Sequence, residues 1–286
     1  MSEHIPVLLT EVLEFLTPFP GGRFIDATLG AGGHSEALLE RTSPDGMLLA
    51  IDQDSDAIEL ASGCLVRFGE RAVIRYGNFS DIANIARETG FEAVNGILAD
   101  LGVSSMMFDR PERGFSFQAD GPLDMRMDRS SPTTAGDIVN YTRETELANL
   151  IYKYGEERRS RPIARSIVRF RPHHTTGDLV RAVEAVSGHR RHGQIHPATR
   201  TFMALRLVVN RELENLETFL DSSVAQLAPG GRLAVISFHS LEDRIVKHRM
   251  RSLGRVLTKK VIRAGETERR GNPRSRSAKL RVMEKS

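Results

Sequence analysis

The sequence predicts an α/β fold in which an inserted helical domain interrupts a doubly wound, mostly parallel sheet. Three observations support this prediction. Strand-like and helix-like patterns alternate through the first 100 residues, residues 101–132 break the alternation, and it resumes from about residue 198. Of the 286 residues, 40% are hydrophobic and 27% are charged. This composition is typical of globular proteins and excludes collagen-like, coiled-coil and wholly disordered chains.

The first third of the chain is predicted to hold four strands joined by three helices. Short apolar runs indicate the strands, and apolar residues at helical spacing indicate the helices. We expect strands at 22–28, 47–52, 72–76 and 93–100, and helices at 35–41, 54–69 and 81–89. Because a helix separates each pair of strands, the strands should run parallel and the helices should cover the sheet.

The rest of the chain predicts an insertion and then a return to the sheet. Residues 101–132 are too long and irregular for an ordinary connection, and the pattern is helical from 133 to about 187. The expected later elements are a helix at 198–227 ending at Pro229-Gly230-Gly231, a strand at 232–238, a helix at 241–253 and strands at 256–262 and 278–283. The predicted domains are therefore 1–105 with 198–286, and an insert at 106–197.

The net charge of +3 conceals a strong segregation along the chain. Residues 1–154 carry −12 and 212–243 carry −5, whereas 155–211 carry +8 and 244–286 carry +12. Two basic segments on an acidic body favour a polyanionic partner, because clustered Lys and Arg bind phosphates. The alternative is a solvated charged face with a loose tail.

The cysteine content and the hydropathy indicate the compartment. Cys64 is the only cysteine, so it can form no internal disulfide and no thiolate metal cluster, and we expect no metal. No apolar run approaches the roughly 18 residues of a membrane span. A cytoplasmic protein with no membrane partner is therefore expected.

A glycine-rich turn follows the first predicted strand and opens a helix. Gly32 and Gly33 would let the backbone approach a ligand closely, and the helix that follows offers N–H groups to an anion. The alternative is a tight turn that needs glycine for its own geometry. The spacing differs from the dinucleotide motif G-x-G-x-x-G, which argues against an NAD-dependent oxidoreductase.

Two further residues follow the ends of the next strands. Asp52 ends the second strand, where a carboxylate can accept hydrogen bonds from both ribose hydroxyls, and Phe79 follows the third, placed to pack on adenine. Alternatively, Asp52 caps the next helix and Phe79 belongs to the core. Because carboxyl ends of parallel strands share one edge, the joint order predicts a cofactor containing adenosine.

Asp100 places another carboxylate at the end of the fourth strand, and further motifs follow it. In chain order the motifs are Asp26-Ala-Thr-Leu-Gly-Ala-Gly-Gly-His34, Ile51-Asp-Gln-Asp54, Asp100-Leu-Gly-Val-Ser-Ser105, Arg113-Gly-Phe-Ser-Phe117, Gly121-Pro-Leu-Asp-Met-Arg-Met127, Tyr154-Gly-Glu-Glu157, His196-Pro-Ala-Thr-Arg-Thr-Phe202, Ser237-Phe-His-Ser-Leu-Glu-Asp-Arg244 and Asn272-Pro-Arg-Ser-Arg-Ser277. On these residues the chain resembles, over nearly its whole length, the bacterial 16S ribosomal RNA (cytosine-N4)-methyltransferase family, RsmH or MraW.

The resemblance implies a Rossmann-like class I methyltransferase that uses S-adenosylmethionine and carries a helical substrate-recognition domain. The cofactor contacts that it implies fall on Gly32, Gly33, His34, Asp52, Phe79, Asp100 and Met107. The family usually has Pro-Gln where this chain has Met106-Met107. A thioether is a poor hydrogen-bonding group, so a contact at Met107 would use the backbone.

The resemblance also implies the reaction, which is methylation of N4 of a cytidine in 16S ribosomal RNA of the 30S subunit, in the decoding region near the P site. The amine lone pair is delocalised into the ring, so an acceptor that holds its N–H and takes the proton would help. No Asp/Asn-Pro-Pro-aromatic box follows the fourth strand. Asp100 is the catalytic candidate, unless the methionine end of the cofactor occupies it.

A second function remains open, in which the chain is an RNA-binding or ribosome-assembly protein that retains S-adenosylmethionine without turnover. The Met106-Met107 departure favours it. Two substitutions test the cofactor assignments. We expect Asp52→Ala to weaken cofactor binding with little loss of stability, and Met107→Gln to tighten binding if an amide makes the family contact.

Other polar residues admit two interpretations each. The loop residues Arg113, Phe115, Phe117 and Arg126 either stack on bases and hold phosphates or plug the loop. Arg274 and Arg276 either contact RNA phosphate or pair with the acidic body.

The histidines are not expected to bind metal or to form a hydrolase site. His239 with Asp243 is an incomplete ligand set, and capping of the next helix by Ser240 is simpler. Phosphate or surface roles are expected for the histidines of the insert, which are His173, His174, His189 and His192.

Overall fold

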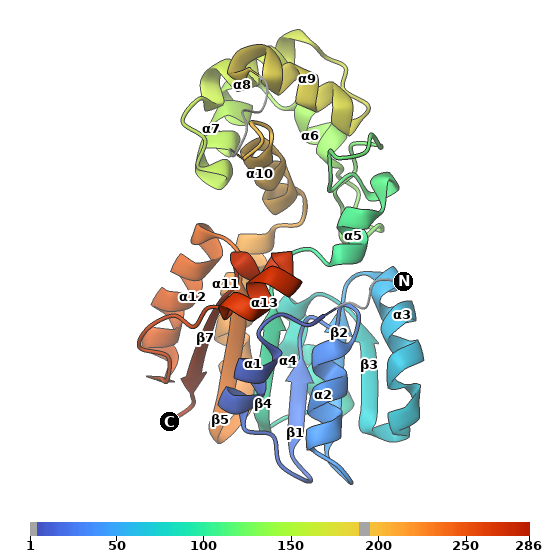
Figure 1. The fold of residues 1–286 in the computed structure, drawn as a ribbon, viewed down its shortest axis with the longest axis vertical. Helices are drawn as coiled ribbons and strands as arrows, with labels where there is room; N and C mark the ends of the chain where they lie inside the picture. Colours follow the sequence, from blue (N-terminus) through green and yellow to red (C-terminus); the bar gives the residue numbers. More distant parts are fainter. Residues whose placement is uncertain (1–4, 189–194) are drawn as a thin grey trace. The chain divides into compact units, whose positions relative to one another are not determined.

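The computed structural model describes residues 5–188 and 195–286 (Figure 1). The chain divides into two compact units, which we call the sheet unit (Met1–Gly102 with Leu213–Ser286) and the helical unit (Val103–Glu212). The sequence places 198–212 with the sheet. In the structure this segment belongs to the helical unit, because Phe202 and Leu205 are buried in the hydrophobic core of that unit.

The sheet unit contains a seven-stranded sheet in the order β3-β2-β1-β4-β5-β7-β6. Its strands are β1 (Arg23–Asp26), β2 (Met47–Asp52), β3 (Ala72–Tyr76), β4 (Val94–Asp100), β5 (Leu227–Ser237), β6 (Arg255–Val256) and β7 (Lys279–Glu284). Neighbouring strands from β3 to β5 pair in parallel, and β7 runs antiparallel to both of its neighbours. The predicted α/β class with a doubly wound, mostly parallel sheet is confirmed.

Helices cover both faces of this sheet, which explains why its central strands are mainly apolar and buried (Figure 1). One hydrophobic cluster packs the sheet against α1 (Leu9–Leu16), α2 (Gly33–Arg41) and α3 (Ser55–Leu65). The other packs it against α4 (Ile82–Thr89), α11 (Glu212–Gln226) and α12 (Ser240–Leu253). The strand order reverses between β1 and β4, and at such a switch point ligands bind beyond the carboxyl ends of the strands.

The helical unit has its own hydrophobic core. Its helices are α5 (Ser105–Asp109), α6 (Ala135–Tyr141), α7 (Glu144–Gly155), α8 (Ser160–Arg169), α9 (Thr176–Ser187) and α10 (Thr199–Val209). Ile163 and Ile167 are fully buried in this core, as the helical spacing of apolar residues predicts. Two helices begin with capping boxes, Thr134 with Asp137 and Thr175 with Asp178.

Three element predictions for the second half were wrong in detail. The single helix expected at 198–227 is two helices, because Arg211 adopts a left-handed φ of 49° that ends α10. β5 already begins at Leu227, so the Pro-Gly-Gly segment lies inside the strand, where Gly230 has a φ of 76°. The strand expected at 256–262 is reduced to the two residues of β6, with only an isolated bridge at Ile262.

The remaining short elements lie in loops. They are the 3-10 helices η1 (Val66–Arg71), η2 (Phe79–Asp81), η3 (Pro111–Arg113) and η4 (Pro273–Arg276) and the helix α13 (Glu266–Gly271). Among residues 5–188 and 195–286, no helix is long and apolar enough to cross a membrane.

Candidate active site

Asp26 and the turn after β1 form the centre of the carboxyl edge of the sheet. The Ser35 hydroxyl donates to Asp26 Oδ2 at 2.7 Å, and the Thr28 N–H donates to Oδ1 at 3.1 Å. Burial raises the pKa of Asp26, although both hydrogen bonds act in the opposite direction. Asp26 was not among the predicted site residues. Its position at the end of a buried strand, directly before small residues, could have indicated it.

The glycines of this turn are required by its geometry. Gly32 is the N-cap of α2 and has a φ of 87°, a backbone angle that residues other than glycine rarely adopt. A Cβ on Gly33 would lie 2.4 Å from Pro6 Cγ. Gly32 is buried, and a Cβ on it would lie 3.2 Å from Ala61 Cβ, so packing within the chain already requires both glycines.

Asp52 ties the end of β2 to this turn. Its Oδ2 accepts the Gly30 N–H at 2.8 Å, and its Oδ1 accepts the Asp54 N–H at 2.9 Å. Burial raises the pKa of Asp52 to about 6. Each carboxylate oxygen retains acceptor capacity for a ribose hydroxyl. Because Asp52 also anchors two backbone groups, the structure argues against the expectation that Asp52→Ala leaves the fold nearly unaffected.

Asp100 ends β4 beside the first turn of α2. Its N–H donates to Thr28 Oγ1 at 2.6 Å, and its Oδ2 lies 4.0 Å from Nε2 of the buried His34. Its Oδ1 is buried and accepts no hydrogen bond from any residue that the structure describes. A buried carboxylate oxygen in this state is expected to meet a donor from a ligand.

Burial raises the pKa of Asp100 to about 7. The positive charge of Arg274 lowers it, and the carboxylates of Asp26 and Glu242 raise it. The Arg274 guanidinium lies 5.9 Å from the centre of the Phe238 ring. A charge from the far end of the chain thus acts on a strand-end carboxylate, and no local sequence pattern announces it.

Phe79 begins η2, just beyond the end of β3. Its ring meets Phe219 edge to face, with 5.2 Å between centroids and 78° between planes. The side chain is only half-buried, so part of the ring remains accessible for packing. Both the core interpretation and the ligand interpretation of Phe79 are compatible with this position.

Met107 lies in the helical unit, unlike the other six predicted cofactor residues. It is 4% exposed and packs in the hydrophobic core of that unit. Its backbone N–H donates to the carbonyl oxygen and to Oγ of Ser104. A glutamine at this position would bury an amide among apolar groups. The structure therefore opposes the expectation that Met107→Gln is a simple gain of a contact.

The aromatic and basic residues of the long loop are mostly used internally. Arg113 is buried and donates to the carbonyls of Arg126 and Met127, and Phe115 is buried in the core. Phe117 packs edge to face on Phe202, with 4.8 Å between centroids. Arg126 forms an ion pair with Asp124, with 2.7 Å between Nε and Oδ1. These contacts support the interpretation that the side chains of the loop pack and pair within the helical unit.

The histidines also have structural roles. His239, not Ser240, is the N-cap of α12, because its ring accepts the Glu242 N–H and the Glu242 carboxylate accepts the His239 N–H. His173 is buried, with Nε2 at 2.8 Å from the Ile167 carbonyl. No group of three potential metal ligands occurs within the described part of the chain.

Two of the four histidines that were predicted in the insert, His189 and His192, lie outside the described residues. Arg276 donates to the Arg269 carbonyl at 3.2 Å, and its side chain is exposed.

The carboxyl edge of the sheet unit fits S-adenosylmethionine on two structural observations. A turn containing Gly32 and Gly33 leads into the N-terminus of α2 at this edge, and the buried Oδ1 of Asp100 has no donor among residues 5–188 and 195–286. When bound, S-adenosylmethionine supplies a methyl group on a positively charged sulfur. The residues that would hold it are Gly32, Gly33, His34, Asp52, Phe79 and Asp100.

Comparison with known proteins agrees with this fit. The profile of the MraW methylase family matches residues 1–286. Ribosomal RNA small subunit methyltransferase H of Nostoc sp. (strain PCC 7120) is 53% identical over 285 residues, which cover 99% of this chain and 92% of that protein. The protein of the same name from Syntrophobacter fumaroxidans is 48% identical over 307 residues, covering 99% of this chain and 96% of that protein.

A solved structure supports the fold independently. The crystal structure of a putative rRNA-methylase from Clostridium thermocellum superposes with a TM-score of 0.50 at 12% identity, covering 99% of both chains. At this identity the likeness shows the fold alone. The family match over the full length and the two close relatives show the rest: the chain belongs to the MraW methylase family, and its methyl donor is S-adenosylmethionine.

Proposed function

We propose that this protein transfers a methyl group from S-adenosylmethionine to N4 of a cytidine in 16S ribosomal RNA of the small subunit, in the decoding region near the P site. The printed names of its relatives support a small-subunit ribosomal RNA substrate. The motif resemblance supports the cytidine N4 position and the decoding region. An enzyme of the 30S subunit would work in the cytoplasm.

The observation that carries the proposal is the buried Oδ1 of Asp100 at the switch point of the sheet, which accepts no hydrogen bond from a described residue. A carboxylate offers about four lone-pair positions, so Asp100 could hold the cofactor and also accept one N–H of a cytidine exocyclic amine. The hydrogen bond would turn the amine lone pair towards the methyl group. Asp100 would take the amine proton as the N–C bond formed, and the electron pair of the broken C–S bond would go to sulfur.

The environment of Asp100 suits this proton transfer. A carboxylate with a pKa of about 7 is a stronger base than an ordinary aspartate and is still largely ionised at slightly alkaline pH. The donation of the Asp100 N–H to Thr28 Oγ1 at 2.6 Å holds the backbone of this residue, and His34 Nε2 lies 4.0 Å from Oδ2, beyond hydrogen-bond distance. We assign the sheet unit to the cofactor and the helical unit to the RNA.

A direct assay tests this proposal. Purified 30S subunits and naked 16S RNA are incubated with methyl-labelled S-adenosylmethionine, and the RNA is digested to nucleosides for mass spectrometry. We expect N4-methylcytidine at one position, which is lost with Asp100→Asn. Intact binding of cofactor and subunits without any label in the RNA would favour the RNA-binding or assembly protein instead. Label in another nucleoside would refute the N4 assignment.

A further inference from the structure

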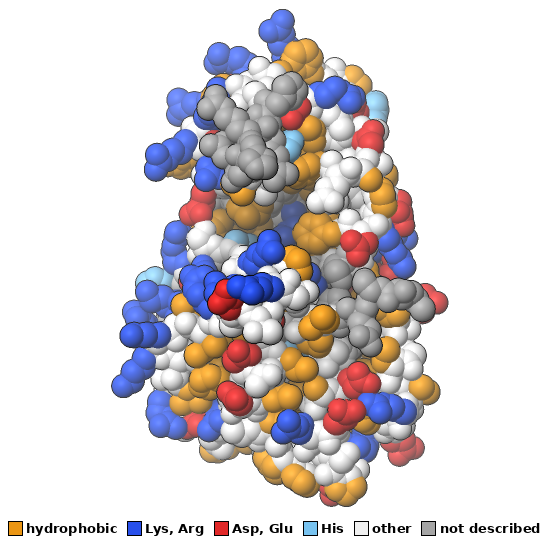
Figure 2. Space-filling model, in the orientation of Figure 1, with side chains coloured by type: hydrophobic (Ala, Val, Ile, Leu, Met, Phe, Trp, Pro, Cys, Tyr) orange, Lys and Arg blue, Asp and Glu red, His pale blue; other side chains and the backbone are white. Residues whose placement is uncertain are grey.

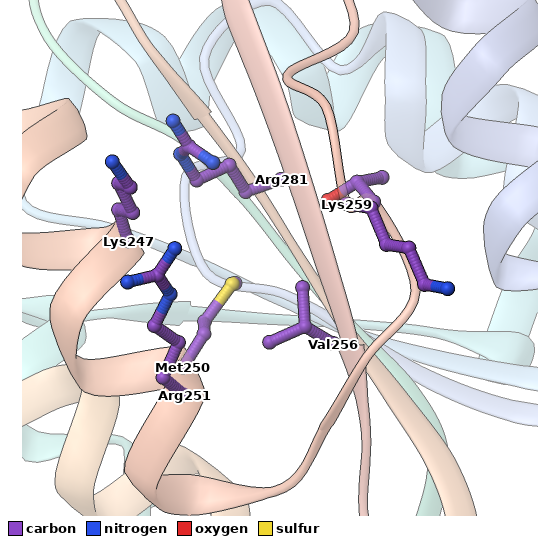
Figure 3. A pocket seen from close by; sticks show the side chains of 7 residues that line it. Lys247, Met250, Arg251, Val256, Lys259 and Arg281 are labelled. Atoms are coloured by element: carbon purple, nitrogen blue, oxygen red, sulfur yellow. The ribbon is translucent and has the colours of Figure 1, made fainter.

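A basic pocket lies in the sheet unit, at the margin formed by α12, β6 and β7 (Figure 3). The pocket there has a volume of about 240 Å³. Cations line it from three elements, with Lys247 and Arg251 on α12, Arg281 on β7 and Lys259 on the segment after β6. In Figure 3 the charged ends of Lys247, Arg251 and Arg281 gather on the side of α12.

Three of these four cations are not paired with any residue that the structure describes. Lys247, Arg251 and Lys259 are exposed, and none has a hydrogen bond or ion pair to another described residue. Lys247 and Arg251 are one turn apart on α12, a spacing at which like charges repel and destabilise a helix. An anion between them would remove this repulsion.

The inner wall of the pocket is fixed. Arg281 donates to Asp243 Oδ1 at 2.7 Å, and Lys279 lies 3.5 Å from the other oxygen, so one carboxylate is shared by two cations. Thr258 is 3% exposed, and its hydroxyl oxygen accepts the Val282 N–H at 3.0 Å. The hydroxyl proton has no acceptor among the described residues and is available to a ligand oxygen.

We propose that this pocket binds a backbone phosphate of the substrate RNA, outside the methyl-transfer site. A phosphate with its water fits the volume, and its oxygens match a set of ammonium, guanidinium and hydroxyl donors. The inference rests on the proposed function, because it takes ribosomal RNA as the partner.

The sheet register places the pocket within reach of the same RNA strand as the active site. Asp100 is opposite Ile236, and Ile236 is opposite Leu280, the residue before Arg281. Two strand spacings separate Asp100 from this end of the pocket by about 10 Å between backbones, whereas Val256, at the other end, pairs with Met283 and lies about 10 Å further from the carboxyl edge. A phosphate in the pocket would therefore lie only a few nucleotides from a base held at Asp100.

The surroundings favour a long polyanion over a small one. Residues 244–286 contain 15 Lys and Arg against three Asp and Glu. Figure 2 shows blue side chains along the margin of the sheet unit that carries α12 and α13. A free phosphate would use one pocket, whereas an RNA strand would also engage the cations around it.

The test compares two double variants that each lose two charges. Lys247→Gln with Arg251→Gln changes the pocket. Arg75→Gln with Arg87→Gln changes two exposed arginines on β3 and α4, towards the opposite edge of the sheet. The dissociation constant of 30S subunits is measured over a range of salt, with methyl transfer and cofactor affinity in parallel.

We expect the pocket variant to raise the KM for subunits about tenfold and to reduce the slope of log Kd against log salt by about 0.7 to 1. The kcat, the cofactor affinity and the Tm should stay level. The charge-preserving variant Lys247→Arg with Arg251→Lys should restore binding, and the control variant should behave as wild type.

Equal salt slopes for the pocket and control variants would overturn the proposal. Inorganic phosphate is tested separately, and if it bound the pocket while the RNA slope stayed unchanged, the site would be one for small anions and the RNA assignment would be wrong. A wild-type protein that binds subunits but transfers no methyl group would contradict only the proposed function. The salt slopes would then still decide the role of the pocket.

Discussion

Carboxylates have opposite energetics at the sheet edge and in the helical unit. In the helical unit, hydrogen bonds hold carboxylates ionised. The Gly177 N–H lowers the pKa of Asp120, and the Thr134 hydroxyl lowers that of Asp137. At Asp124 and Asp178 burial raises the pKa, but hydrogen bonds lower it by more. The pKa values of these two residues are therefore also lowered. These side chains cap helices and fix loops.

At the carboxyl edge of the sheet, burial dominates. It raises the pKa of Asp26, raises that of Asp52 to about 6 and raises that of Asp100 to about 7. Elsewhere in the same unit Asp243 is partly buried, but hydrogen bonds and charge from Arg281 and Lys279 lower its pKa. A raised pKa is therefore a property of carboxylates at the carboxyl edge of the sheet, and not of all carboxylates in the sheet unit.

The comparison separates carboxylates that build the fold from those retained for chemistry. An ionised carboxylate that is buried with few donors destabilises the protein at neutral pH, so its presence at a ligand edge indicates a role in binding or catalysis. Substitutions in the two regions should consequently have opposite effects on stability and activity.

The largest expected effect is that of Asp100→Asn on the rate of methyl transfer. An amide cannot take the amine proton, so kcat should fall by about 10²- to 10⁴-fold. Rates are measured with labelled cofactor at saturation, and cofactor affinity is measured by calorimetry. We expect the cofactor affinity to change less than the rate. An equal loss of both would assign Asp100 to holding the cofactor alone.

Asp52→Asn should mainly reduce cofactor affinity. Weakening two ribose hydrogen bonds should cost on the order of 2 to 3 kcal/mol, or about 30- to 150-fold in Kd. Calorimetry measures this change, and Asp137→Asn provides the matched substitution in the helical unit, where the Kd should stay level. An unchanged Kd for a folded Asp52→Asn protein would remove the ribose assignment.

Met107→Gln should destabilise the protein by about 1 to 3 kcal/mol, because it buries an amide in an apolar core. The neighbouring Met106 is half-buried, so Met106→Gln is the matched control and should be nearly neutral. Denaturant unfolding measures both variants. If the Met107→Gln protein had normal stability and bound the cofactor more tightly, this result would support the side-chain contact that the family resemblance suggests.

Thr175→Ala should give the smallest effect, a loss of about 1 kcal/mol, because it removes one half of the capping box at α9. The pKa of Asp178 is lowered, so its contribution to stability is present above its ordinary pKa and is lost as the pH falls. Thermal unfolding should therefore show a smaller effect of Thr175→Ala at pH 3 than at pH 7. The same loss at both pH values would contradict the capping role of the ionised carboxylate.

The sequence predicted those parts of the site that depend on local pattern. Gly32, Asp52 and Asp100 could be placed together because the alternation of strands and helices fixes one shared carboxyl edge. The break at Arg211 could not be predicted, because apolar periodicity continues through it and the residue is not glycine.

Contacts between distant segments were also beyond the sequence. Arg274 lowers the pKa of Asp100 only because β7 brings the end of the chain beside β5. The burial of Met107 likewise depends on the packing of the whole helical core, which its neighbours in sequence do not specify.

The most direct test is the free energy of unfolding between pH 4 and pH 8, for wild type and Asp100→Asn without cofactor. With a native pKa of about 7 against an ordinary 3.8, folded wild type binds more protons than the unfolded chain in this range. Its stability should therefore fall as the pH rises through the native pKa. Asp100→Asn lacks this dependence, so at pH 8 it should be more stable than wild type by roughly 1 to 4 kcal/mol, with a smaller difference at pH 4. Parallel curves for the two proteins would contradict the claim that Asp100 is kept at the sheet edge at the expense of stability.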